Sequence, residues 1–191
     1  MEKIMKRCKW CNERNALYIE YHDKEWGIPR FDDAYLFEML VLESFQAGLS
    51  WECVLNKREA FRASFDGFLP ELIADYGEDK LDALMNESSI IRNRRKISST
   101  VINAKVFLDI VSEFGSFYNY LRLFWHGNTV FENKLTSSPL SDAISRDLSR
   151  RGMKFVGTTI IYSFLQAIGV INSHEDECDF LKLRGMHDEQ Q

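Results

Sequence analysis

The chain has 191 residues, of which 45% are hydrophobic and 28% charged, and its formal net charge is −5 at pH 7. This composition excludes a disordered or fibrous chain and suits one compact globular unit with its own core. No apolar run approaches the roughly 20 residues that span a bilayer, and the start MEKIMKRCKW lacks the apolar core of a signal peptide. We therefore expect a cytoplasmic protein without membrane contact, whose four cysteines are reduced thiols or metal ligands.

The first third of the chain predicts a loop-dominated arm followed by two helices. Residues 1–31 are rich in aromatic residues but have no long periodic segment. A buried helix capped by Asp32 or Asp33 then leads into EMLVLESFQAGLSW, residues 38–51, and we expect it to end with Gly48 in a left-handed conformation. Ser50 can cap a second helix, whose apolar face is Trp51, Val54, Leu55 and Phe61.

The rest of the chain alternates helical apolar periods with glycine or proline breaks. The predicted helices cover residues 70–75, 78–85, 94–114, 117–125, 140–151 and 158–168. Residues 126–138 lack the alternation of a strand and are predicted to form a loop. The sequence thus predicts an all-α protein.

A carboxylate lies within the buried helix of the 38–51 stretch. At helical spacing Glu43 shares a stripe with Met39 and Leu40, so its carboxylate points with the apolar residues. A buried carboxylate needs a partner. Leu49 follows as an apolar residue at a turn, and Trp51 begins the next helix. An acid, an exposed apolar tip and an aromatic ring therefore meet at one corner.

Flat aromatic faces stack on bases, and a purine turned out of a duplex needs such a pocket together with a group that reads its edge. The candidate for the edge-reading group is Glu43. The aromatic candidates are Tyr18, Tyr21, Trp26, Trp51 and, in addition, Trp10. Most aromatic residues in a chain of this kind are simply core. Their concentration beside a buried acid is what favours a base pocket.

The segment RGMKFVGTT, residues 151–159, predicts two helices joined by a tight turn. Free amide groups at the start of the second helix, at Thr158 and Thr159, can bind an anion such as a phosphate. A side chain at Gly157 would hold the phosphate away. The pattern is similar to the helix-hairpin-helix element, which grips the DNA backbone without reading sequence; a plain packing turn would also need glycine.

Basic residues are clustered within residues 57–62, 92–96 and 146–154. A local basic face can bind nucleic acid even in an acidic protein. The alternative is a set of solvated helix faces, which commonly carry such runs.

Four residues from the two ends of the chain have the side chains that zinc prefers: Cys8, His22, His174 and Cys178. A site with four protein ligands has no open position for water, so it would be structural and would clip the chain ends together. Cys11 forms CKWC with Cys8 and could replace His22 as a ligand. The alternative is a set of buried thiols and ordinary histidines.

The chain closely resembles the bacterial type I (constitutive) 3-methyladenine DNA glycosylases over nearly its whole length. The resemblance rests on His174, Cys178 and four segments: YIEYHDKEWGIP (18–29), LFEMLVLESFQAGLSW (36–51), IIRNRRKI (90–97) and RGMKFVGTTIIYSFLQAIGVIN (151–172). It implies an all-α helical bundle of the helix-hairpin-helix glycosylase superfamily with a zinc-held lobe. Residues 1–191 would form one unit, with a bundle lobe over about 32–165, including hairpin 151–159, and a terminal lobe of residues 1–31 plus 166–191.

The resemblance also implies roles for the matching residues. A structural Zn²⁺ would be held by Cys8, His22, His174 and Cys178. The base would be recognised by Glu43, Tyr18, Tyr21, Trp26 and Trp51. The DNA would be contacted by Gln46, Gly48, Leu49, Ser50, Gly157, Thr158 and Thr159, with Leu49 as the plug in the duplex. Two residues depart from the family pattern: Cys11 has no counterpart, and Phe45 stands where a polar residue is expected, which would alter the pocket edge or the DNA contact.

The implied reaction is hydrolysis of the N-glycosidic bond of 3-methyladenine in double-stranded DNA, with free 3-methyladenine and an abasic site as products. Methylation at N3 makes the base a cationic leaving group, so little acid catalysis is required. Superfamily relatives commonly use an aspartate after the hairpin, where this chain has Asn172 and Ser173. Selection is then the main work: Glu43 favours a cationic purine, and Tyr21 and Trp51 sandwich its ring.

No lysine is placed as a Schiff-base nucleophile, so we expect a monofunctional enzyme, and we expect a monomer. Two other hypotheses remain at this point. One is a noncatalytic helix-hairpin-helix DNA-binding protein with a structural zinc, in which Phe45 blocks the pocket. The other is a zinc-stabilised helical interaction protein without affinity for DNA.

Overall fold

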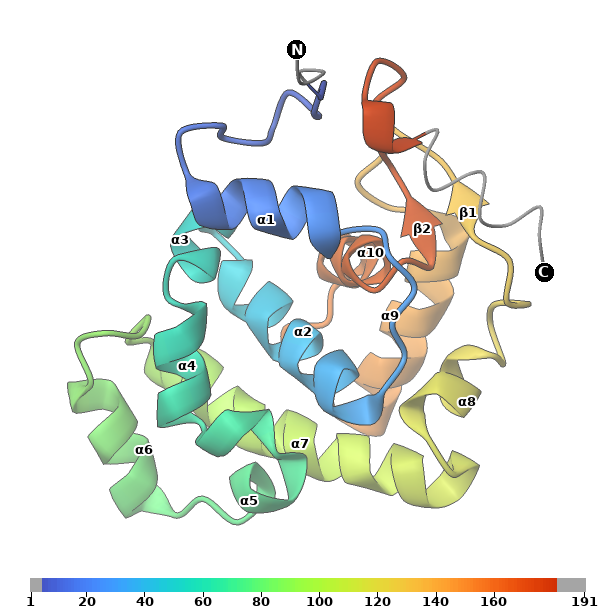
Figure 1. Cartoon of the computed structure of the whole chain (residues 1–191). Coiled ribbons are helices and arrows are strands. Elements are labelled where there is room, and N and C mark those ends of the chain that lie inside the picture. The colour runs from blue at the N-terminus through green and yellow to red at the C-terminus, as the bar shows by residue number, and fades with distance from the viewer. Residues whose placement is uncertain (1–4, 182–191) are drawn as a thin grey trace.

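The computed structural model describes residues 5–181 and shows a mostly helical protein (Figure 1). In chain order its elements are α1 (Ala16–Lys24), α2 (Asp33–Gln46), α3 (Trp51–Leu55), α4 (Arg58–Ser64), the 3-10 turn η1 (Asp66–Phe68), α5 (Pro70–Ala74), α6 (Glu78–Asn86), α7 (Arg94–Phe114), α8 (Phe117–Leu121), β1 (Val130–Phe131), α9 (Pro139–Arg151), α10 (Thr158–Ala167) and β2 (Ile171–Asn172). Within residues 5–181, no helix is both long and apolar enough to cross a membrane.

Helix α2 is the central element of the core. Every residue from Tyr35 to Phe45 is buried, as expected for a helix that is apolar almost all the way round. Helix α10 packs against α2 and α9, and the long helix α7 packs against α5, α6 and α8 (Figure 1). The fold thus surrounds α2, with the carboxyl end of this helix leading into the corner at Leu49.

The predicted helix boundaries in the middle of the chain are confirmed to within a few residues. Asp32 provides the cap of α2, because its Oδ1 accepts a hydrogen bond of 3.0 Å from the Tyr35 amide. Ser50 Oγ likewise accepts from the Cys53 amide at 3.2 Å. Gly48 has φ +80° and Gly115 has φ +83°, the left-handed conformations that end helices.

Three details of the sequence prediction are wrong, and one helix was not predicted. The helix that was not predicted is α1, which lies in the loop-dominated arm of residues 1–31 and is capped by Asn15. The predicted loop of residues 126–138 contains β1, which pairs in parallel with β2, so the protein is not entirely α-helical. The predicted second helix is divided into α3 and α4. The helix predicted over residues 117–125 ends at Leu121.

The two ends of the described chain lie together, at the top of Figure 1. The Asp179 amide donates to the Lys6 carbonyl at 3.0 Å, and the Lys6 amide donates to Asp179 Oδ2 at 3.0 Å. The predicted division into two lobes stays a prediction; its boundary at 165/166 falls inside α10. Of the predicted terminal lobe, residues 1–4 and 182–191 lie outside the described residues.

Candidate active site

A cavity of about 400 Å³ opens at the predicted base pocket. The residues that line it come from α1 and the segments on either side of it, from α2, α3 and α10, and from the segments after β1 and β2. They are Trp10, Tyr18, Tyr21, Trp26, Glu43, Gln46, Trp51, Asn133, Lys134, Ser163, Gln166, Ser173 and Glu175. All five residues predicted to recognise the base therefore line one cavity, together with Trp10.

Two buried polar atoms in the cavity wall have no partner within the described protein. Glu43 is 3% exposed, and its Oε2 has no hydrogen-bond partner among residues 5–181. The indole Nε1 of Trp51 also has no hydrogen-bond partner among these residues. Such an atom costs about 1–3 kcal/mol when it is buried without a bond. A ligand that binds both atoms would recover this cost.

Burial raises the pKa values of three side chains in the cavity wall. It raises the pKa of Glu43 from its usual 4.5 to about 8, because the charged carboxylate loses contact with water. Burial likewise raises the pKa of Tyr18 to about 12 and lifts that of Tyr21 well above its usual 10. At neutral pH the wall therefore offers neutral hydroxyls and a carboxyl group that a nearby cation can ionise.

The aromatic rings form two groups along the wall. Trp10 lies between Tyr18 and Trp26, with ring centroids at 5.5 and 4.7 Å. Tyr21 and Trp51 contact each other, with centroids 5.1 Å apart and planes tilted by 44°. A base between two parallel rings needs roughly 7 Å, twice the usual stacking distance of about 3.5 Å. The predicted sandwich of a base between Tyr21 and Trp51 is therefore not formed in this arrangement.

Several polar residues of the wall were not predicted from the sequence. Ser163 and Gln166 lie one turn apart on the mainly apolar second half of α10, and this spacing could have revealed them. Glu175 follows β2, and Asn133 and Lys134 follow β1. No local pattern marks these three residues, because the pairing of β1 with β2 brings them to the cavity.

The two residues in place of the superfamily aspartate have separate positions. Asn172 is buried, and its Oδ1 accepts from the His174 amide at 3.1 Å and lies 2.9 Å from Nδ1 of the same histidine. Ser173 lines the cavity, and its hydroxyl donates to the Glu132 carbonyl at 2.6 Å. Neither residue supplies a carboxylate to the cavity.

The tip of the corner after α2 points away from the cavity. Gln46 lines the cavity, whereas Leu49 is 42% exposed and Gly48 and Ser50 are also exposed. The Leu49 amide donates to the Gln46 carbonyl at 2.7 Å and closes the turn. One helical end thus presents an acid to the pocket and a leucine to the solvent.

Phe45 does not have the predicted effect on the pocket. Its side chain is fully buried and packs on Phe61 and Phe65, with ring centroids at 4.7 and 6.0 Å. It is not among the residues that line the cavity. The expectation that Phe45 alters the pocket edge, and the hypothesis that it blocks the pocket, are wrong because the ring faces the opposite side of α2.

The predicted hairpin is formed by α9, a turn and α10. Gly152 ends α9 with φ +107°, and Gly157 precedes α10 without any side-chain cap. A Cβ atom at Gly157 would meet nothing within 4 Å, so the protein itself leaves space there. The Thr158 hydroxyl donates to Asp142 Oδ1 at 2.6 Å, whereas Thr159 is exposed. The helix therefore offers its first amides, and not the Thr158 hydroxyl, to an anion.

Most of the clustered basic residues belong to two groups; Lys57 and Lys96 belong to neither, because their amines donate to backbone carbonyls. The members that form ion pairs within the fold are Arg58, Arg62, Arg94, Arg150 and Arg151. The members that are exposed and have no ion pair within residues 5–181 are Arg92, Arg95, Arg146 and Lys154. The second group has charge available for a partner.

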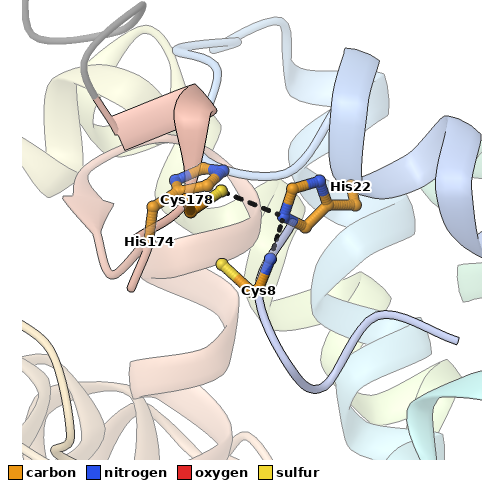
Figure 2. Close-up of side chains that lie close together, drawn as sticks. All are labelled: Cys8, His22, His174 and Cys178. Carbon is orange, nitrogen blue, oxygen red and sulfur yellow. Dashed lines mark hydrogen bonds between the residues drawn. The ribbon is translucent and has the colours of Figure 1, made fainter. Parts of the chain in front are cut away.

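The four predicted metal ligands converge in the interior (Figure 2). One ligand atom from each of Cys8, His22, His174 and Cys178 lies within 4.8 Å of the others, and all four residues are buried. Cys8 lies before α1 and His22 within it, and the other two follow β2. Cys11 is outside this group, and its thiol donates to the Tyr18 carbonyl at 3.7 Å. The structure thus assembles the ligand set that contains His22.

Polar contacts orient both imidazole rings of this cluster. His22 Nδ1 lies 2.8 Å from Asp23 Oδ1, and His174 Nδ1 lies 2.9 Å from Asn172 Oδ1. The His22 Nε2 atom accepts from the Cys8 amide at 3.3 Å and lies 3.6 Å from Cys178 Sγ. Such outer contacts fix which ring nitrogen faces the centre, as they do around metal-binding histidines.

A buried acid in an aromatic-walled cavity, beside an exposed leucine and an uncapped helix start, is the arrangement of a DNA glycosylase site. The family model for methyladenine glycosylase matches residues 10–182. DNA-3-methyladenine glycosylase 1 of Escherichia coli (strain K12) is 44% identical over 181 residues, which cover 91% of this chain and 96% of that protein.

Two solved structures of 3-methyladenine DNA glycosylase I are similar over almost the whole chain. One has a TM-score of 0.87 at 43% identity and covers 91% of this chain and 98% of that one. The other, a variant in complex with 3-methyladenine, has a TM-score of 0.86 at 32% identity and covers 92% of this chain and 97% of that one. The chain belongs to the methyladenine glycosylase family, which confirms the sequence-based identification.

Proposed function

We propose that the protein hydrolyses the N-glycosidic bond of 3-methyladenine in alkylated double-stranded DNA, releases the free base and leaves an abasic site. The observation that carries this proposal is the unpaired carboxyl group of Glu43 in an aromatic cavity. Family membership makes the chain a DNA glycosylase, and the cavity supplies the physical basis for its choice of base.

Glu43 would select the base by charge and by hydrogen bonding. A cationic purine favours the ionised carboxylate, which lowers the cost of placing that charge in the interior. The ionised Glu43 then accepts hydrogen bonds from the purine edge, and the rings of the wall contact the purine faces. An unmethylated adenine lacks the positive charge and gains none of this stabilisation. Because N3 methylation already weakens the glycosidic bond, the cavity needs no strong general acid.

The outer surface would hold the duplex around the extruded nucleotide. Leu49, exposed at the corner, would fill the gap left by the base, with Gln46, Gly48 and Ser50 beside it. The hairpin of α9 and α10 would act as a helix-hairpin-helix element that binds a backbone phosphate through the amides after Gly157. The exposed basic residues Arg92, Arg95, Arg146 and Lys154 support this surface by their charge.

The cluster of Cys8, His22, His174 and Cys178 would hold a structural Zn²⁺. Two thiols and two imidazoles are a donor set that zinc prefers, and their buried convergence supports the assignment. When bound, the ion would fasten the N-terminal segment to the segment after β2, as a zinc-held lobe. It would take no part in base release, because four protein ligands fill its coordination.

The enzyme would be monofunctional. The one lysine in the described cavity wall, Lys134, is exposed and lies 3.8 Å from the Asp176 carboxylate, an ion pair that engages its amine. A Schiff-base nucleophile needs an amine free of its proton. That the enzyme is a monomer in the cytoplasm stays a prediction.

The proposal is tested with methylated duplex DNA and chromatography of the bases released. We expect release of 3-methyladenine, alkali-labile abasic sites and no direct strand cleavage. Duplex binding without release of any base would overturn the proposal and support a noncatalytic DNA-binding protein. The absence of both binding and release would instead support an interaction protein.

A further inference from the structure

Lys96 is a buried lysine that the proposed reaction does not use. It is 7% exposed, although it belongs to the basic run of residues 92–96. Burial lowers the pKa of its ammonium group. Within residues 5–181 it forms no ion pair with a carboxylate, which is unusual because buried charges are normally paired. Other groups of the protein must therefore replace the water that the Lys96 ammonium group loses on burial.

The partners of Lys96 are the last carbonyl groups of α2. The Lys96 Nζ atom donates to the Phe45 carbonyl at 2.8 Å and to the Ala47 carbonyl at 2.6 Å. Helix α2 has no basic residue in its own last turn. A cation at a helix carboxyl end satisfies unpaired carbonyls and interacts favourably with the helix dipole. Lys96, from the first turn of α7, therefore caps α2 immediately before the Leu49 corner.

The same lysine adjoins the turn between α9 and α10. Its Nζ lies 6.0 Å from the centre of the Phe155 ring. Phe155 has φ +54°, a conformation that is unfavourable for a side chain of this size, and its carbonyl accepts from Ser44 Oγ of α2 at 3.2 Å. Asn103 of α7 bonds both backbone polar groups of Lys154 in the same turn, at 2.8 and 2.9 Å.

We propose that Lys96 is a positioning residue that fixes the Leu49 corner relative to the turn of residues 152–157. The leucine that enters the duplex and the amides that hold the phosphate then meet the DNA at a set separation. This inference rests on the proposed function, since it concerns how the duplex is engaged. It assigns to Lys96 a role distinct from that of its neighbour Arg95, which is exposed and available to the DNA backbone.

The test is a double-mutant cycle with Lys96→Met and Leu49→Ala. Lys96→Met keeps an unbranched side chain, one atom shorter, but removes the charge and the donors. We expect it to slow single-turnover excision about tenfold, because a misplacement of about 1 Å can cost roughly 10²-fold and a smaller displacement costs less. Binding of free 3-methyladenine should stay within twofold of the parent value. In the Leu49→Ala background, Lys96→Met should slow excision less than twofold further.

Arg95→Met is the matched control, because it removes a charge from the adjacent position. We expect it to weaken duplex binding and to reduce the salt dependence of binding. If Lys96→Met gives this same pattern, or if its loss is fully additive with Leu49→Ala, the inference is overturned. Should Lys96→Met fail to fold, Lys96→Gln, which keeps donors without charge, enters the same cycle with the same criteria. Absence of base release by the parent protein would reject the proposed function instead.

Discussion

Tyr21 and His22 are neighbours on α1, yet they face two sites whose polar atoms are arranged differently. His22 faces a cluster whose thiols and imidazoles converge on one another and whose rings are held by Asp23 and Asn172. Tyr21 faces a cavity in which Glu43 Oε2 has no protein partner among residues 5–181. A converging set of ligand atoms is suited to a permanent structural ion. An unpaired atom in an open cavity is suited to a ligand that arrives and leaves.

The largest effect should come from breaking the converging cluster. His174→Ala should abolish stoichiometric zinc and lower the free energy of unfolding by about 4 kcal/mol or more, because metal binding contributes directly to folding. Elemental analysis and denaturant unfolding measure the two quantities. Cys11→Ser is the matched control, since this buried thiol lies outside the cluster; it should keep the metal. One zinc per chain in purified His174→Ala would contradict the assignment of the ligands.

Substitution of Glu43 in the open cavity should raise the free energy of unfolding, whereas substitution in the cluster lowers it. Because the pKa of Glu43 is raised in the folded state, the folded protein binds more protons than the unfolded chain between pH 4.5 and about 8. The free energy of unfolding contributed by this group therefore falls as pH rises, by about 1.4 kcal/mol per pH unit in that window. Glu43→Gln removes the dependence. The stability advantage of Glu43→Gln should grow across the window and be constant outside it. Denaturant unfolding at several pH values measures this advantage, and a difference independent of pH would refute the expected burial.

A smaller effect should follow at the hairpin, which belongs to neither site. Gly157→Ala meets no atom within 4 Å and has ordinary backbone angles, so its melting temperature should match the parent. Its duplex affinity should fall about tenfold, because the methyl group would occupy the proposed place of the phosphate. Gly77→Ala is the matched control at the start of α6, where a Cβ also meets nothing. Equal duplex affinities for the two variants would show that the hairpin only packs.

The sequence predicts most of the helical fold because α2, α7 and α10 have apolar periods long enough to be recognised locally. Helix α1 has no such period, because its nine residues bury only Tyr18, Tyr21 and His22, which is little more than one turn of pattern. The strands β1 and β2 are two residues each and their paired residues lie 41 positions apart, so their pairing depends on the tertiary structure and leaves no local alternation.

The same distinction applies to the sites. The buried orientation of Glu43 follows from its place on α2, and the residue types at positions 8, 22, 174 and 178 by themselves suggest a metal site. From the sequence alone, either Cys11 or His22 could complete the ligand set. In the structure His22 lies in the cluster and Cys11 lies outside it. Within the basic run of residues 92–96, neighbouring residues have different environments: Arg95 is exposed, whereas Lys96 is buried and caps another helix. Only the packing of α2 against α7 reveals this difference.

The measurement that tests the central claim most directly is single-turnover release of 3-methyladenine by Glu43→Gln beside the parent enzyme. If the unpaired carboxylate of the cavity selects the cationic base, Glu43→Gln should bind the duplex within twofold of the parent and release the base about 10²- to 10³-fold more slowly. Release at the parent rate by a folded Glu43→Gln variant would contradict the claim that this carboxylate recognises the damaged base.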